Sequence, residues 1–180
     1  SEPSSADLAG RLVEHLKGRP QDLAGKRVLV IPRANPDGLA AGTRWNARGV
    51  DLNRNFATDN FEPCARNGLA ALSEPESRAL VRAIALYRPS CVVSVHAPLN
   101  CIDADGVDAS YALAREMARV SPLPVNDLPA MPGSLGSYAG DELGLKMITY
   151  ELDRKKTPGN SPAAYLDSHL PALLAAIGRG

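Results

Sequence analysis

The stretch from Gly42 to Phe56 gathers the side chains of this sequence that are best suited to binding an anion. It places three arginines and three asparagines around a single aspartate, Asp51. These six residues are Arg44, Asn46, Arg48, Asn53, Arg54 and Asn55. Guanidinium and amide groups donate paired hydrogen bonds, so this combination could grip a carboxylate. The alternative interpretation is a solvated Arg/Asn-rich loop without a ligand.

The residues before this stretch predict how it is held. Residues 33–38 contain Asn-Pro and Asp-Gly, two dipeptides that are typical of turns. They follow the apolar run of residues 27–31, which is typical of a strand buried on both faces. We therefore expect a buried strand that runs into a rigid loop carrying the cationic side chains.

Helical and strand patterns alternate along the rest of the sequence. Apolar residues at helical spacing predict helices over 4–18, 73–87, 108–120, 134–143 and 163–177. Short apolar runs predict two further buried strands, over 91–95 and 146–150, and the Pro-rich residues 122–132 predict a loop with a short strand. Strands that alternate with helices indicate an α/β sandwich around a largely parallel sheet.

Length, composition and charge restrict the class of protein. A chain of 180 residues with 44% hydrophobic residues suits one domain with a full core. Twenty basic and twenty acidic residues balance to zero, which argues against nucleic acid or an anionic membrane as the partner. The sequence contains no run of roughly 18 apolar residues, so it predicts no transmembrane helix. The three cysteines have no metal-type spacing, so we expect free thiols and a cytoplasmic protein.

Two predicted strands end on residues that are common in catalytic sites. The strand of residues 91–95 is followed by His96, and the strand of residues 146–150 is followed by Glu151. Ligands of open α/β sheets bind beyond the carboxyl ends of the strands, so we expect both residues to face the Arg/Asn-rich loop. Taken singly, His96 could be a core histidine, and Glu151 could be an ion-pair partner of the cationic residues that follow it.

The order of these motifs resembles that of the zinc carboxypeptidases of the carboxypeptidase A type. The matching segments are Asn35-Pro-Asp-Gly38, Thr43-Arg-Trp-Asn46, Gly49-Val-Asp-Leu-Asn-Arg-Asn-Phe56, Ser94-Val-His96 and Thr149-Tyr-Glu-Leu152. The resemblance implies that Asn53 and Arg54 hold the terminal carboxylate of a peptide substrate and that Arg44 stabilises the oxyanion. It also implies a helix–sheet–helix sandwich around a mixed, mostly parallel sheet.

The resemblance further implies a catalytic Zn²⁺, with His96 as a ligand and Glu151 as the general base. Glu2 matches the glutamate of the family's His-x-x-Glu motif, so its histidine is expected three positions earlier, outside this sequence. His15 and His169 are not expected to replace it, because each lies within a predicted helix on a probable surface. The family also has strands before this motif, so residues 1–180 are expected to form one catalytic domain that is incomplete at its N-terminus.

Two further segments resemble a small bacterial branch of the family, the murein peptide amidases. They are Val95-His-Ala-Pro-Leu-Asn-Cys-Ile-Asp103 and Pro132-Gly-Ser-Leu-Gly-Ser-Tyr138. This implies hydrolysis of the bond between γ-D-glutamate and meso-diaminopimelate in a small cell-wall peptide. The base of the specificity pocket falls at Leu135 or Gly136, and neither is acidic, which argues against a simple Lys/Arg-selective pocket. The alternatives are an N-acyl amino acid deacylase, similar to aspartoacylase, and a non-catalytic peptide-binding module without zinc.

One backbone feature also follows from the resemblance. Family members carry a cis peptide between the two residues that follow the ligand histidine, and here those residues are Ala97 and Pro98. A cis bond before proline costs only about 0.5–1 kcal/mol, against about 3 kcal/mol before other residues. We therefore expect the Ala97–Pro98 bond to be cis.

Overall fold

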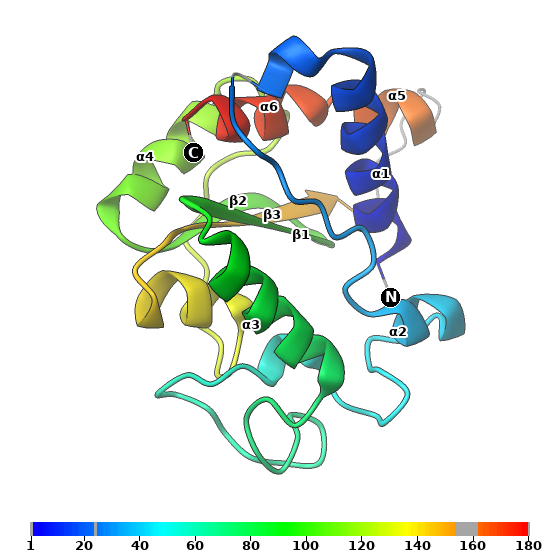
Figure 1. Cartoon of the computed structure of the whole chain (residues 1–180), viewed down its shortest axis with the longest axis vertical. Coiled ribbons are helices and arrows are strands. Elements are labelled where there is room, and N and C mark those ends of the chain that lie inside the picture. Colours follow the sequence, from blue (N-terminus) through cyan, green and yellow to red (C-terminus); the bar gives the residue numbers. More distant parts are fainter. Residues whose placement is uncertain (1, 24, 154–161, 180) are drawn as a thin grey trace.

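The computed structural model describes residues 2–23, 25–153 and 162–179 (Figure 1). The helices are α1 (Pro3–Gly18), α2 (Pro36–Ala41), α3 (Pro75–Tyr87), α4 (Asp108–Ala118), α5 (Pro162–Asp167) and α6 (Leu170–Arg179). The strands are β1 (Cys91–His96), β2 (Leu99–Gly106) and β3 (Lys146–Asp153). Three short helical turns complete the described part of the chain: η1 (Pro20–Leu23), η2 (Leu52–Arg54) and η3 (Ser137–Glu142).

The strands form one mixed sheet in the order β1-β3-β2. β1 runs parallel to β3, and β2 runs antiparallel to it. The predicted α/β fold with a mixed sheet is confirmed. The described part of the sheet has one parallel and one antiparallel pair, because β2 follows β1 after only two residues and the chain reverses direction there. The Ala97–Pro98 bond within this connection is cis, as predicted.

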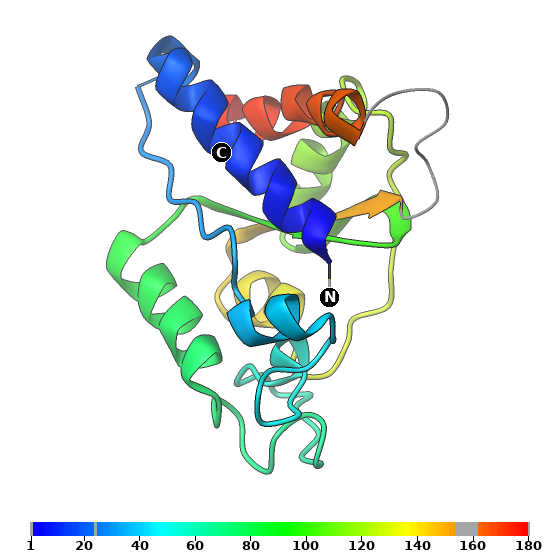
Figure 2. The ribbon, with the colours of Figure 1, turned by 90° about the vertical axis from the view of Figure 1, so that its right-hand side faces the viewer.

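Helices cover both faces of the sheet. Figures 1 and 2 show α1, α4, α5 and α6 on one face, and α3 together with η3 on the other. The first face holds the main hydrophobic core, in which Leu8 and Leu12 of α1, Met117 of α4 and Ile148 of β3 are buried together. Burial of apolar surface is worth roughly 25 cal/mol per Å², so this face dominates the stability of the sheet. The opposite face, which α3 and η3 cover, lies outside this core.

The segment predicted as the first strand is extended but is not a strand. Residues 27–31 pair with no other segment in the described part of the chain. Val28 and Val30 pack against the hydrophobic core, whereas Leu29 and Ile31 are 46% and 43% exposed. The prediction was wrong because an apolar run specifies hydrophobicity and cannot show whether a neighbouring strand is present to pair with it.

Helix ends and short elements also differ from the prediction. α1 begins at Pro3, without a side-chain cap from the serines that follow, and the predicted helix over 163–177 is divided into α5 and α6 by a turn at Ser168 and His169. The Asn-Pro and Asp-Gly dipeptides start α2, with Asn35 accepting a hydrogen bond from Gly38 N at 2.9 Å. β2 was not predicted at all. The predicted short strand in residues 122–132 is a single bridge, between Val125 and Ile102.

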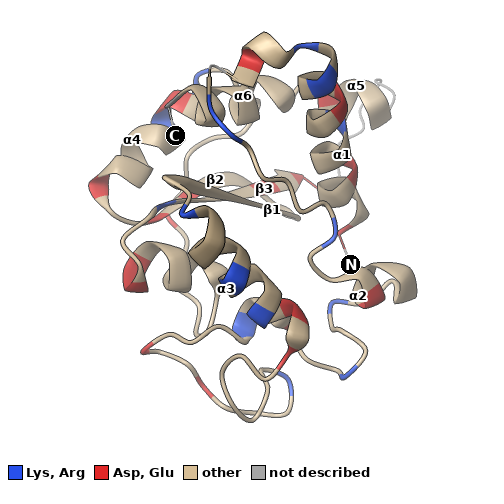
Figure 3. Cartoon of the chain, in the orientation of Figure 1, with Lys and Arg blue, Asp and Glu red and all other residues tan. Residues whose placement is uncertain are grey.

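Charge is spread evenly over the structure. Figure 3 shows basic and acidic residues interspersed along the ribbon. Among the residues described, no helix combines the length and the apolarity needed to cross a membrane. The three cysteines are all unpaired, as predicted.

His169 is fully buried, contrary to the prediction of a surface position. Its Nδ1 lies 2.7 Å from the hydroxyl of Tyr150, which in turn lies 2.7 Å from Ser121 Oγ. Among the residues that the structure describes, its Nε2 is buried without a hydrogen-bond partner. Burial lowers the pKa of His169 to about 4, because the charged form of the ring loses its hydration in the core.

This depressed pKa predicts a loss of stability in mild acid. The unfolded chain binds the proton near pH 6.5 and the folded chain only near pH 4, so the free energy of unfolding should fall between these values. The loss should be on the order of 3 kcal/mol. Urea unfolding at pH 7 and pH 4.5 measures it. His169→Asn, which keeps a hydrogen-bonding group but does not titrate there, should remove this component, and His15→Asn should leave it intact. An equal pH dependence in wild type and His169→Asn would contradict the assignment.

Candidate active site

The register of the sheet places two predicted catalytic residues in one row. His96, the last residue of β1, pairs with Glu151 of β3, and Cys101 of β2 pairs with the same Glu151. Paired residues point to the same face of a sheet, and successive residues alternate between faces. Because Tyr150 belongs to the hydrophobic core, His96 and Glu151 both lie on the opposite face.

The N-terminus of α1 brings Glu2 to His96. Oε2 of Glu2 lies 3.2 Å from Nδ1 of His96, and Ser94 Oγ lies 2.8 Å from the other ring nitrogen. Burial alone would lower the pKa of His96, but the hydrogen bond and the charge of Glu2 outweigh it, so the pKa is raised. The same contact outweighs the effect of burial on Glu2 and lowers its pKa. A carboxylate oxygen and an imidazole nitrogen thus converge on one point.

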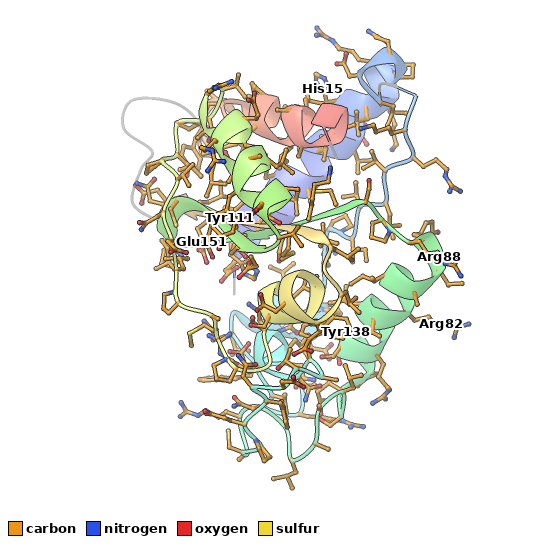
Figure 4. All side chains as sticks on the ribbon, turned by 90° about the vertical axis from the view of Figure 1, so that its left-hand side faces the viewer. His15, Arg82, Arg88, Tyr111, Tyr138 and Glu151 are labelled. Carbon is orange, nitrogen blue, oxygen red and sulfur yellow. The ribbon has the colours of Figure 1, made fainter. Side chains whose placement is uncertain are left out.

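These two donors fit part of a catalytic zinc site. Zinc accepts carboxylate oxygen and imidazole nitrogen, and catalytic sites use three protein ligands. Over residues 2–23, 25–153 and 162–179, no group of three or more His, Cys, Asp or Glu side chains is placed to hold a metal ion. Figure 4 shows His15 at the end of α1 that lies away from Glu151, and His169 is buried on the core face. Neither histidine can therefore join Glu2 and His96.

Glu151 is a largely buried carboxylate beside this pair. Its side chain is 8% exposed, and its Oε2 accepts a hydrogen bond of 3.3 Å from Leu99 N. Burial raises its pKa above the ordinary value, and the neighbouring His96 and Arg44 only partly counteract this. A carboxylate with a raised pKa is suited to accepting a proton and releasing it again.

Asp51 organises the arginine loop. Its Oδ2 accepts a hydrogen bond from Nε of Arg44, and its Oδ1 accepts one of 3.1 Å from Asn53 N, which caps η2. The sequence showed this aspartate among the arginines, but we assigned it no role. Its position directly before Leu-Asn-Arg is the signal that could have identified it as a capping residue.

Asn53 and Arg54 connect η2 to the loop before η3. Asn53 Oδ1 accepts a hydrogen bond of 2.8 Å from Leu135 N, which fixes residues 135 and 136 beside the arginine loop. Arg54 Nη1 donates to Asn53 O at 2.5 Å. The Arg54 side chain is only partly buried and lines a cavity, so its other N–H groups can reach a ligand.

The remaining arginine and asparagines of the stretch, Asn46, Arg48 and Asn55, are not part of the cavity lining. Asn46 and Asn55 are 6% and 0% exposed, and they bind the buried carboxylate of Glu74 and the backbone around it. Arg48 is exposed, with Nε 4.0 Å from Glu74 Oε2. Of the six arginines and asparagines of this stretch, Arg44, Asn53 and Arg54 line the cavity, and these are the three to which the family resemblance assigns roles. Burial would raise the pKa of Glu74, but the hydrogen bonds of Asn46 and Ser73 lower it.

One cavity joins the predicted site residues. It has a volume of about 830 Å³ and continues from the polar end along the apolar edge of β1 towards α3, so the site occupies only part of it. Its lining includes every site residue predicted from the sequence: Glu2, Arg44, Asn53, Arg54, His96, Leu135, Gly136 and Glu151. Residues from five separate parts of the chain therefore face one space.

Comparisons with known proteins agree with this arrangement. A family model described as zinc carboxypeptidase matches residues 19–102. Murein peptide amidase A of Escherichia coli K12 is 38% identical over 145 residues, covering 70% of this chain and 58% of the relative. Murein peptide amidase A of Vibrio campbellii is 35% identical over 167 residues, covering 82% of this chain and 63% of the relative. The chain thus spans about three fifths of the length of these relatives.

Solved structures show the same similarity in three dimensions. The crystal structure of murein-tripeptide amidase from Escherichia coli O157 superposes with a TM-score of 0.66 at 31% identity, covering 83% of this chain and 67% of that one. The thrombin-activatable fibrinolysis inhibitor superposes with a TM-score of 0.76 at 20% identity, over 99% of this chain and 60% of the other, which shows the shared fold alone. On this evidence, the chain belongs to the zinc carboxypeptidase family.

Proposed function

We propose that the protein is a zinc-dependent peptidase that hydrolyses an amide bond next to a free carboxylate. Its substrate would be a small cell-wall peptide, cleaved between γ-D-glutamate and meso-diaminopimelate. The observation that carries the proposal is the convergence of Glu151, Arg54 and the Glu2–His96 pair on one cavity. The murein peptide amidases among the relatives support this substrate over that of an N-acyl amino acid deacylase.

Each of these residues would have a separate role around the scissile bond. Arg54 and Asn53 would hold the terminal carboxylate, which fixes cleavage at a chain end. Arg44, kept in place by Asp51, would meet the negative charge that develops on the carbonyl oxygen. Glu151 would take a proton from the attacking water and pass it to the leaving amine. Zinc, when bound by Glu2, His96 and a further ligand, supplies a Lewis acid that acidifies water.

We further propose that the protein works in the cytoplasm, where peptides released from the cell wall can be reused. The three unpaired cysteines support this location, because disulfides are rare in reducing compartments. A small peptide with a terminal carboxylate is the expected partner.

Glu151→Gln tests the proton-transfer role. The amide keeps the shape of the side chain but cannot carry the proton, so kcat should fall by about 10²- to 10⁴-fold while zinc content is unchanged. Steady-state kinetics on the murein tripeptide and metal analysis measure the two quantities. Glu62→Gln, at an exposed position, is the matched control and should keep full activity. Turnover near the wild-type rate in Glu151→Gln would remove this residue from the mechanism.

Arg54→Ala tests the carboxylate-binding role. Loss of a charge-assisted pair should cost roughly 2–5 kcal/mol in kcat/KM for peptides with a free carboxylate. Peptides amidated at that position should be affected much less. Arg48→Ala removes an exposed arginine from the same loop and serves as the control. Equal losses on free-acid and amidated peptides would show that Arg54 does not bind the carboxylate.

His96→Ala tests the metal site and separates the peptidase from a peptide-binding module without zinc. The full-length protein should contain about one zinc ion per chain, and the variant should lose it, because catalytic zinc needs three protein ligands. Metal content after dialysis measures this, and His15→Ala should retain zinc. A full-length wild-type protein that takes up no zinc would favour the non-catalytic module.

A further inference from the structure

The end of β3 that carries Glu151 is paired on one side only. β1 pairs with β3 as far as His96, which lies opposite Glu151, whereas β3 continues to Asp153. On the other side, β2 pairs with β3 to its end, where Leu99 lies opposite Asp153. In the described sheet, the residues of β3 that follow Glu151 therefore have no strand on the β1 side.

A tyrosine of α5 occupies this position instead. Asp153 N donates a hydrogen bond of 3.0 Å to the hydroxyl oxygen of Tyr165, and the same hydroxyl donates one of 3.2 Å to Asp153 O. One side chain thus binds both backbone groups of Asp153, as a residue of a paired strand would. Burial raises the pKa of Tyr165, so its hydroxyl keeps the proton that it donates. Figures 1 and 2 show α5 close to the C-terminal end of β3.

His169 packs against the ring of Tyr165. The two rings meet edge to face with centroids 4.7 Å apart, and His169 meets the ring of Tyr150 in the same way at 5.6 Å. Tyr150 directly precedes Glu151, and its hydroxyl lies 2.7 Å from His169 Nδ1. One buried histidine therefore contacts two tyrosines, one that belongs to β3 just before Glu151 and one that binds β3 just after it.

The residue opposite Asp153 is also the residue that binds the Glu151 side chain. Leu99 N donates a hydrogen bond of 3.3 Å to Glu151 Oε2. Because Leu99 pairs with Asp153, a displacement of Asp153 would move this donor as well as the strand that carries Glu151. The position of the carboxylate thus depends in two ways on the end of β3.

We propose that Tyr165 is a positioning residue for the proposed reaction, and that its hydroxyl fixes the Glu151 carboxylate by holding the end of β3. The inference rests on the proposed function, because it takes Glu151 to be the group that accepts a proton from water. Tyr165 is not part of the cavity lining, so it acts through the strand and not on the substrate. A small displacement of a catalytic group is sufficient to slow a reaction.

Tyr165→Phe tests this assignment in the full-length, zinc-loaded protein. Phenylalanine keeps the ring that packs on His169 and removes only the hydroxyl, so the fold should be retained. For the murein tripeptide, kcat should fall by about 5- to 50-fold with KM and zinc content unchanged, because the carboxylate is misplaced while the substrate is still held. Tyr111→Phe removes an exposed hydroxyl outside the cavity lining, so this matched control should keep full activity.

A double-mutant comparison separates positioning from general damage to the fold. If Tyr165 acts through Glu151, Tyr165→Phe should change kcat by less than about 2-fold in the Glu151→Gln background, because the proton acceptor is already lost. A loss by the same factor in both backgrounds would overturn the inference. So would an unchanged kcat in Tyr165→Phe alone.

Hydrogen exchange separates failure of this inference from failure of the proposed function, because it requires no hydrolysis. Exchange of the Leu99 amide, measured by NMR, should be about 10-fold faster in Tyr165→Phe than in wild type or Tyr111→Phe, since its hydrogen bond to Glu151 is weakened. If the peptide is not cleaved but exchange responds in this way, the proposed reaction fails and the positioning role stands. An unchanged exchange rate in Tyr165→Phe would show that its hydroxyl does not position the carboxylate.

Discussion

The side-chain alternation along β3 links the stability of the fold to the geometry of the site. Ile148 and Tyr150 are buried in the core, while Thr149 and Glu151 face the cavity. A slip of one residue in the pairing of β3 would turn its core residues towards the cavity and its polar residues into the core. The hydrophobic burial that holds the register therefore also holds Glu151 opposite His96. The hydrogen bond from Leu99 N to Glu151 then fixes the carboxylate itself.

The arginine loop must hold several positive charges close together at the edge of the sheet, where they repel one another. Burial lowers the pKa of Arg54, and the positive charge of Arg44 lowers it further. The negative charge of Asp51 partly counteracts both effects. Asp51 binds Arg44 directly and caps the turn that carries Arg54. On the far side of the loop, the buried Glu74 accepts a hydrogen bond from Asn46. Asp51 and Glu74 thus bind residues of the loop, and the side chains of Arg44 and Arg54 line the cavity.

The sequence predicted those parts of the fold that depend on local pattern. The helices α3 and α4, and the strands β1 and β3 with His96 and Glu151, follow from hydrophobic spacing and residue type. Whether residues 27–31 and β2 are strands depends instead on which segments pair with them. The local pattern of residues along one segment does not show its pairing partner. The site residues were placed by family resemblance, but the role of Asp51 in organising the arginine loop was not. Asp51 makes its contacts within its own loop, with Arg44 and with Asn53 N, so a local pattern could have indicated its role.

Asp103 and Asp105 of β2, which line the cavity, also show why a pocket should not be judged from one segment. Leu135 and Gly136 are not acidic, which argued against a pocket for a cationic side chain. The structure shows that Gly136 lacks a side chain at the point where Asp105 fills the space. The charge of a pocket belongs to all the strands and loops that enclose it, and here β2 contributes it from beneath the loop. With arginines and aspartates both in its lining, the cavity carries groups of both signs of charge.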